Sequence, residues 1–168
     1  MKEITVKELN IHPVKEISDG WMLLTAGTEG SYNTMTCSWG HIGSLWGCAN
    51  GTAICYVRPQ RYTKEFVDRE PLYTLCFFPE EYKKQLSYLG SHSGRDEDKV
   101  ANAGLTPVYG EGYTYFAEAK LVLVCRKLYQ ATLTEEGFLD KSILQKHYPS
   151  RDLHDMYIGQ IEKILTAE

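Results

Sequence analysis

The sequence predicts a mainly β chain with short helices inserted between its strands, folded as a closed or partly closed antiparallel barrel. Short segments of strand composition recur along the chain, bounded by glycine or proline. The helical segments between them do not follow the regular strand–helix alternation of a parallel sheet. Neither GxGxxG nor GxxxxGKS/T occurs, which argues against a Rossmann or P-loop nucleotide site.

Composition predicts a single domain over residues 1–168. The chain has 168 residues, of which 43% are hydrophobic and 12 are tyrosine, enough for one core and too few for two comfortable ones. The net charge of −4 argues against a polyanionic partner, so nucleic acid binding is not expected.

The N-terminal sequence MKEITVKELN is charged and lacks the apolar centre of a signal peptide. The longest apolar run, residues 121–125, is far too short to cross a membrane. We therefore expect a cytoplasmic protein without a membrane partner. The odd number of cysteines predicts free thiols, and Cys55, Cys76 and Cys125 lie in apolar runs that belong in a core.

In the first third of the chain, residues 21–28 and 31–39 have strand composition, with a turn between them. Residues 41–51 contain three glycines and predict a loop or an irregular strand. Residues 52–57 predict a short buried strand, which Pro59 ends.

Residues 62–69 predict a helix with Thr63 as its N-cap and with Phe66 and Val67 facing inward. Residues 72–78 predict the next strand.

Pro79 opens a helix at residues 80–89, and Gly90 ends it as a C-cap. A short helix at residues 96–103 ends at Gly104. The remaining expected elements are strands at residues 116–128 and 156–165 and a partly helical segment at residues 137–147.

The segment GSHSGR, residues 90–95, lies between two predicted helices and has the composition of an anion site. Glycines let backbone N–H groups approach an anion, and the hydroxyls of Ser91 and Ser93 and the guanidinium of Arg95 complete the ligands. Acidic residues open the following helix and would repel an anion, so we expect the anion on the loop side. The alternative is an ordinary helix–loop–helix connection with Asp96 as a cap.

The segment VRPQRYT, residues 57–63, ends a predicted strand and begins a helix, where a loop often faces a ligand. Arg58 precedes proline and is therefore held extended, and Arg61 follows three residues later. The alternative is that the two arginines form surface ion pairs with nearby acidic residues. Those acidic residues are Glu65, Asp68 and Glu70.

The segment NTMTCSWG, residues 33–40, predicts an extended strand with alternating side chains. Thr34, Thr36 and Ser38 would face one way, and Met35, Cys37 and Trp39 the other. An extended edge offers backbone groups to a flat ring that carries donors and acceptors in one plane, and Trp39 or Trp46 could stack on such a ring. The alternative is a half-buried strand with core tryptophans, which we favour for Trp46.

Two other patterns are weaker indications of a functional site. Cys37, His41 and Cys48 could suggest a metal site, but their spacing matches no zinc knuckle and no second cysteine pair follows, so none is expected. Ser91, His92 and the aspartate four residues further on are the residue types of a catalytic triad. They are nearly adjacent in sequence and lack a nucleophile elbow.

Together, the patterns NTMTxSWG, VRPxRYT and GSxSGRDxDK resemble the flavin reductase-like family of FMN-binding split barrels, in its flavoredoxin-type branch. The likeness extends over residues 19–165, nearly the whole chain. Three separated segments that combine a phosphate site with a ring site are specific as a set. The resemblance implies a split β-barrel that forms a homodimer and binds FMN near the subunit interface.

The resemblance also implies which residues contact the cofactor. Residues 36–39 would line the flavin ring, and Arg58, Tyr62 and Thr63 would approach the ring or the ribityl chain. The phosphate end would lie beside Ser91, Ser93, Arg95 and Lys99. The expected cofactor-binding residues are Asn33, Thr34, Met35, Thr36, Cys37, Ser38, Trp39, Arg58, Arg61, Tyr62, Thr63, Ser91, Ser93, Gly94, Arg95 and Lys99.

The implied function is an FMN-binding oxidoreductase in which NADH or NADPH reduces the flavin and a flavin, a ferric complex or a small oxidant accepts the electrons. The alternative is a flavoredoxin-like electron carrier that a redox partner protein reduces and that has no nicotinamide site. The one candidate catalytic residue is His154. His154 matches a histidine that relatives often carry before the last strand, although their preceding Gly-Asp is here Asp152-Leu153. It is either a solvent-facing turn residue or a group beside the ring.

Overall fold

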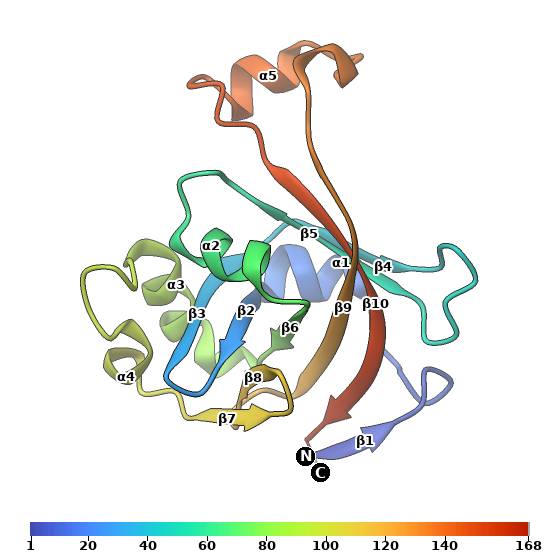
Figure 1. The fold of residues 1–168 in the computed structure, drawn as a ribbon, viewed down its shortest axis with the longest axis vertical. Helices are drawn as coiled ribbons and strands as arrows, with labels where there is room; N and C mark the ends of the chain where they lie inside the picture. Colours follow the sequence, from blue (N-terminus) through green and yellow to red (C-terminus); the bar gives the residue numbers. More distant parts are fainter. Residues whose placement is uncertain (168) are drawn as a thin grey trace.

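The computed structural model describes residues 1–167 and confirms a mainly β architecture with inserted helices (Figure 1). The strands are β1 (Lys2–Ile4), β2 (Met22–Thr28), β3 (Ser31–Cys37), β4 (Gly40–Gly43), β5 (Thr52–Val57), β6 (Leu72–Phe77), β7 (Pro107–Gly110), β8 (Tyr113–Phe116), β9 (Leu121–Thr132) and β10 (Asp155–Thr166). The helices are α1 (Pro13–Lys15), α2 (Tyr62–Arg69), α3 (Lys83–Ser91), α4 (Lys99–Ala103) and α5 (Ser142–His147). A π-helical turn at Glu16–Gly20 and 3₁₀ turns at Glu80–Tyr82 and Glu135–Gly137 complete the regular structure of these residues. No helix within residues 1–167 is long and apolar enough to cross a membrane.

The main sheet is antiparallel and has eight strands, in the order β3-β2-β6-β9-β10-β5-β4 with β1 beside β10. The first and last strands of this order, β3 and β4, are connected by Ser38 and Trp39 alone. A connection of three peptide steps spans at most about 11 Å. The sheet must therefore curl until its two edges come close at this point. The predicted partly closed barrel is confirmed, and its split lies beside Trp39.

Gly40 begins β4 at this split and has no space for a side chain. A Cβ atom on Gly40 would lie 2.7 Å from the carbonyl oxygen of Ile54 and 2.9 Å from the terminal methyl group of Met22. Met22 and Ile54 belong to β2 and β5, which are far apart in the strand order. Both nevertheless approach Gly40, because the sheet has curled.

The central strands are buried on both faces. Neighbouring residues of β2, Leu23 and Leu24, pack into two different cores. The inner core fills the curl of the sheet, and Phe66 and Val67 of α2 face inward to join it, as predicted. The outer core lies between the sheet, α3 and the β7–β8 hairpin. Burial on both faces explains why β2 does not alternate between apolar and polar residues, and even its Thr25 is fully buried.

The cysteines follow the predicted pattern. Cys55, Cys76 and Cys125 are fully buried, and all five cysteines are free thiols.

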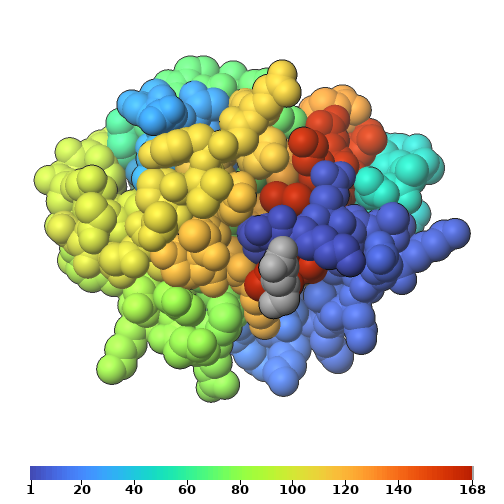
Figure 2. All heavy atoms as spheres, turned by 90° about the horizontal axis from the view of Figure 1, so that it is seen from below, coloured from blue at the N-terminus to red at the C-terminus, as the bar shows by residue number. Residues whose placement is uncertain are grey.

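Strands β9 and β10, each of 12 residues, are the longest of the described strands. They extend beyond the body of the sheet as an arm that carries α5 (Figure 1). At the opposite end of the molecule, β1 pairs with the last residues of β10. Figure 2 shows the N-terminal segment lying across the C-terminal strand on this face.

Two predicted helix caps are wrong. The N-cap residue of α2 makes no side-chain hydrogen bond, and the hydroxyl of Thr63 instead accepts a hydrogen bond from the amide of Asn33. Helix α3 runs one residue past Gly90. The glycine lets the helix approach β3, because a Cβ atom there would lie 3.2 Å from Cβ of Thr36. Both caps were inferred from local sequence, whereas contacts with β3 decide both positions.

The strand predicted at residues 116–128 corresponds to β9 but begins too early, because a turn follows Phe116 and β9 begins at Leu121. The helix predicted from residue 96 begins at Lys99. Its cap is Asp98, whose carboxylate accepts a hydrogen bond from the N–H of Ala101 at 3.1 Å, and not Asp96. The prediction missed β1, β7 and all of β8 but its last residue, and these three strands are short and carry little pattern.

Replacing Gly40 by alanine should destabilise the fold, because the added methyl group would overlap the Ile54 carbonyl oxygen and the Met22 side chain. Overpacking of this kind costs about 1–3 kcal/mol. Gly43→Ala is a matched control on the same strand, since nothing lies within 4 Å of its Cβ position. Urea unfolding should give a lower free energy of unfolding for Gly40→Ala than for the control. Equal values would show that the split is loosely packed.

Candidate functional site

Trp39 lies at the split of the barrel and is accessible. It is 42% exposed, and its ring centroid lies 5.4 Å from that of His147 and 5.2 Å from that of His154. A partly exposed aromatic surface between two imidazoles is available to a ligand. Trp46, for which we favoured a core position, is 59% exposed on the loop after β4, against Tyr129, so that prediction is wrong.

His154 precedes β10 and is only 7% exposed, which rules out a solvent-facing turn position. Its Nδ1 atom lies 2.7 Å from the hydroxyl oxygen of Tyr148. Burial, together with the positive charge of Arg58, lowers the pKa of His154 to about 4. The imidazole is therefore neutral at pH 7 and can take part in hydrogen bonding without adding charge.

Arg58 connects the end of β5 to the arm. Its guanidinium forms an ion pair with Asp152 at 2.6 Å and donates to the carbonyl oxygen of His147 at 2.9 Å. The guanidinium carbon also lies 5.1 Å from the centroid of the Tyr148 ring. These contacts hold the arm, and with it His154, against the mouth of the barrel.

The alternative pairing of Arg58 and Arg61 with nearby acidic residues is wrong, because those carboxylates have other partners within residues 1–167. The observed pairs are Glu65–Arg95, Asp68–Lys64 and Glu70–Arg69. Arg61 instead reaches across to the end of α3, where it donates to the carbonyl oxygen of Gly90 at 3.4 Å.

Two small polar cavities adjoin at the barrel mouth, and Met35, Thr36 and Arg61 line both. The tryptophan cavity, of about 180 Å³, is further lined by Cys37, Ser38, Trp39, Tyr56, Arg58 and His154. The serine cavity, of about 140 Å³, is further lined by Asn33, Gln60, Tyr62, Thr63, Leu89, Gly90, Ser91, His92, Ser93, Gly94 and Lys99. The three separated sequence segments therefore meet in space.

Within β3, the predicted alternation of side chains is confirmed. Met35 and Cys37 belong to the inner core, whereas the Thr36 hydroxyl points to α3 and donates to the carbonyl oxygen of Leu86 at 2.6 Å. Burial raises the pKa of the Cys37 thiol to about 12, so this cysteine stays protonated at pH 7.

Asn33 connects β3 to the other two segments. Its amide nitrogen donates to the Thr63 hydroxyl at 2.8 Å. A Cβ atom on Gly94 would lie 2.2 Å from the side-chain oxygen of Asn33, so the loop approaches this closely only with glycine at position 94.

Lys99 is almost fully buried, at 4% exposure. Its amine donates to the carbonyl oxygens of Leu89 at 2.9 Å and His92 at 3.0 Å. Burial, together with the nearby charge of Arg61, lowers the pKa of Lys99 to about 8. Lys99 thus holds the C-terminal end of α3 in place as well as bordering the serine cavity.

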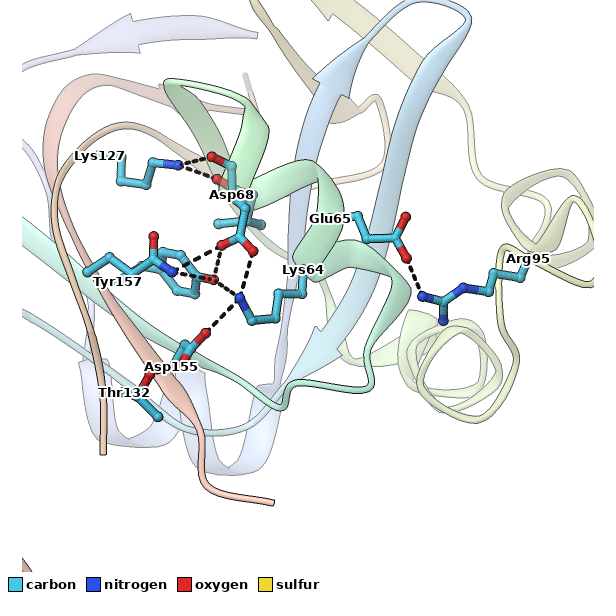
Figure 3. A network of polar contacts seen from close by, with 10 residues as sticks. Lys64, Glu65, Asp68, Arg95, Lys127, Thr132, Asp155 and Tyr157 are labelled. Atoms are coloured by element: carbon cyan, nitrogen blue, oxygen red, sulfur yellow. Dashed lines mark hydrogen bonds and ion pairs between the residues drawn. The ribbon is translucent and has the colours of Figure 1, made fainter. Parts of the chain in front are cut away.

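Two expected cofactor-binding residues do not line either cavity. Thr34 is fully buried, and its hydroxyl oxygen lies 2.8 Å from that of Thr25. Arg95 points toward α2, where it pairs with Glu65 (Figure 3) and lies over the Tyr62 ring at 4.6 Å. A phosphate in the serine cavity would have to draw Arg95 away from this carboxylate.

A network of charged and polar groups fixes α2 beneath these cavities (Figure 3). The Lys64 amine lies 2.6 Å from Asp68 on the same helix and 2.7 Å from Asp155 on β10. The Tyr157 hydroxyl donates to Asp68 at 2.5 Å. Burial lowers the pKa of Lys64, but the hydrogen bonds to Asp155 and Asp68 outweigh it, so the net shift is upward. Because Asp155 follows His154 directly, the network fixes the strand that carries His154 relative to α2.

The metal and triad patterns do not form sites. Within residues 1–167, no group of three or more His, Cys, Asp or Glu side chains is arranged to hold a metal ion. The Ser91 hydroxyl lies 3.1 Å from Nδ1 of His92, but that nitrogen also lies 3.0 Å from the carbonyl oxygen of Tyr88. A nitrogen that donates to a carbonyl cannot accept the serine proton.

Two tyrosines of the site escaped sequence reasoning. Tyr56 lines the tryptophan cavity, and Tyr148 contacts both Arg58 and His154. Tyr56 could have been found from its position on the outward face of β5. Tyr148 had no sequence signal, because only the fold of the arm brings it to the barrel.

Comparison with known proteins identifies the family. The family model described as the flavin reductase like domain matches residues 14–168. The chain belongs to the flavin reductase-like family. A search of curated protein sequences gives no match.

Solved structures share the fold of this flavin reductase-like chain. The flavoredoxin of Desulfovibrio vulgaris (Miyazaki F) is 22% identical, with a TM-score of 0.67 over 100% of this chain and 78% of that one. The FMN-binding protein from Thermus thermophilus with bound p-hydroxybenzaldehyde is 20% identical, with a TM-score of 0.66 over 88% of this chain and 71% of that one. The NADH:FAD oxidoreductase of Streptomyces globisporus C-1027, in complex with NAD and FAD fragments, is 16% identical. Its TM-score is 0.64 over 88% of this chain and 74% of that one.

The buried neutral state of His154 should make stability depend on pH. The unfolded chain takes up this proton near pH 6.5, whereas the folded chain takes it up near pH 4. Stability due to neutral His154 is therefore present above pH 6.5 and lost as the pH falls toward 4, by on the order of 2–3 kcal/mol. Urea unfolding of wild type and His154→Gln across this range should show a flatter profile for the variant. Parallel profiles would contradict a buried neutral histidine.

Proposed function

We propose that this protein is an FMN-dependent oxidoreductase that takes electrons from NADH or NADPH and passes them to a flavin or another small acceptor. The observation that supports it best is the pair of adjoining polar cavities. The serine cavity offers hydroxyl groups and a cation, and the tryptophan cavity offers an aromatic surface. Membership of the flavin reductase-like family supports the same assignment.

The residues at the barrel mouth fit FMN in charge and chemistry. Ser91, Ser93 and Arg61 would contact the phosphate or the ribityl chain in the serine cavity. Arg95 would join them after leaving Glu65. Trp39 would cover part of the ring in the tryptophan cavity.

Bound FMN would supply the two-electron redox chemistry, and the chain would supply position and charge. Arg58 and Arg61 place positive charge beside the proposed ring position, which favours an anionic reduced flavin. His154 stays neutral and Cys37 stays protonated, so neither competes for that charge. No protein group has to act as a general base.

The identity and reducibility of the cofactor test the proposal directly. The purified protein should release FMN on denaturation, as identified by chromatography. Anaerobic addition of NADH and then NADPH should bleach the bound flavin. A protein that binds FMN but is reduced by neither nucleotide would be an electron carrier served by a protein partner. FAD, or no flavin bound after addition of FMN, would contradict the proposal.

We also propose a homodimer, which rests on the family resemblance and on the surplus of aromatic residues. Light scattering of the FMN-loaded protein should give twice the mass of the 19.2 kDa chain. A monomer mass would contradict this.

Arg95→Ala combined with Ser93→Ala should weaken FMN binding at least about tenfold while leaving riboflavin binding nearly unchanged, because the lost contacts are to phosphate.

Glu65→Gln should strengthen FMN binding, since it releases Arg95 from its ion pair. An exposed pair of this kind is worth about 0.2–1 kcal/mol, so FMN should bind roughly 1.4- to fivefold more tightly.

The matched control for Glu65→Gln is Glu70→Gln, which removes an equal charge from the same region but frees Arg69 instead. In an Arg95→Ala background, Glu65→Gln should have no effect on FMN affinity. If Glu65→Gln raised FMN affinity equally in the Arg95→Ala background, Glu65 would act through net charge and not through Arg95.

Trp39→Ala should disturb the flavin spectrum and slow flavin reduction with little loss of stability, because the side chain is largely outside the core. A buried tryptophan would instead cost about 3–5 kcal/mol on truncation. The melting temperature of the apo protein and the reduction rate at saturating FMN separate the two. A large drop in melting temperature with an unchanged rate would place Trp39 in the core.

A further inference from the structure

A third cavity lies beside the tryptophan cavity and differs from it in chemistry. It has a volume of about 820 Å³, within the range of small-molecule binding sites. Ser38, Trp39 and Tyr56 line both cavities, so a molecule in the larger one would lie next to the proposed flavin ring. Its remaining walls come from residues 11–18, strand β4 and the arm.

The walls of this apolar cavity carry no Lys, Arg, Asp or Glu side chain. Its surface is mostly aliphatic and aromatic, with Val14, Ile17 and Ile42 among the aliphatic residues. A charged ligand would lose hydration here without gaining an ionic partner, which is unfavourable. The cavity therefore selects against ferric chelates and other multiply charged acceptors and in favour of neutral molecules.

His12, Ser18 and Ser38 add polar groups to this surface, and Tyr56 and His41 form a polar pair on it. The Tyr56 hydroxyl oxygen lies 3.5 Å from Nδ1 of His41, and the two rings are edge-on at 6.0 Å. A contact this long is weak, so both groups stay available to donate to a ligand. Two donors beside an aromatic wall at Trp39 match a flat ring that carries a carbonyl oxygen at its edge.

We propose that the apolar cavity binds the electron acceptor and that this acceptor is a neutral quinone. The inference rests on the proposed binding of FMN in the adjoining cavities. Two electrons pass from the reduced flavin to the quinone, two protons are taken up at its two oxygens, and the products are oxidised FMN and the hydroquinone. The electrons come from NADH or NADPH, or from photoreduction in the test below.

The test uses tetramethyl-1,4-benzoquinone, which has no free ring position for addition of a thiol. Calorimetric titration into the oxidised FMN-loaded protein measures binding without turnover. Anaerobic mixing with photoreduced protein measures the rate of reoxidation against quinone concentration. We expect saturable binding and a saturable rate, with similar half-saturating concentrations.

Val14→Glu is the informative variant, because Val14 is 70% exposed and the substitution puts a carboxylate on the cavity wall without emptying the core. It should raise the quinone dissociation constant and the half-saturating concentration at least about tenfold, since the charge makes the wall polar. Ile42→Glu on β4 should act alike. Val6→Glu, a partly exposed valine outside the cavity, is the matched control and should change neither value.

FMN content is measured first in every variant, so the two proposals fail separately. Protein that holds no FMN contradicts the proposed function. The acceptor proposal is overturned if protein that holds FMN shows no saturation with the quinone. It is also overturned if Val14→Glu and Val6→Glu have equal quinone dissociation constants and equal half-saturating concentrations. If a second copy of the chain covers the cavity, Val14→Glu will yield monomers by light scattering while quinone binding is unchanged, which also overturns it.

Discussion

The short connection between β3 and β4 constrains the whole molecule. These strands lie at opposite ends of the main strand order, yet only Ser38 and Trp39 separate them in sequence. A chain of that length cannot bridge a flat sheet of this width. Curling brings the edges together, encloses the inner core and leaves an incomplete seam at Trp39. The same constraint therefore creates both the barrel and the opening in which the candidate site lies.

The arm completes that opening from the other side. Arg58 reaches from β5 to Asp152 and the carbonyl oxygen of His147, and Lys64 reaches from α2 to Asp155. Each contact joins segments roughly ninety residues apart. Between them they fix His154 in a buried position, where desolvation keeps it neutral. The site thus has fixed positive charge from Arg58 and Arg61 beside a neutral His154.

The cavities at the barrel mouth are of two kinds, which differ in the charge of the side chains that line them. The tryptophan and serine cavities are small and polar and are bordered by arginine or lysine, whereas the large adjoining cavity carries no charged side chain. Trp39 stands at the boundary and faces both. Such a division suits a reaction in which a charged cofactor stays bound and a neutral molecule is exchanged. The Arg95–Glu65 pair is exposed and therefore weak.

The sequence by itself determined the mainly β class, the core positions of three cysteines and the three segments that meet at the candidate site. These features depend on composition and on spacing within a few residues, which the local sequence carries. It did not determine the caps of α2 and α3, the exposure of Trp46 or the partner of Arg95. At Thr63 and Gly90 a tertiary contact with β3 replaced the expected local cap. The apolar cavity and the low pKa of His154 likewise arise from segments far apart in sequence, because burial and the nearness of charges exist only once the sheet has curled and the arm has closed on it.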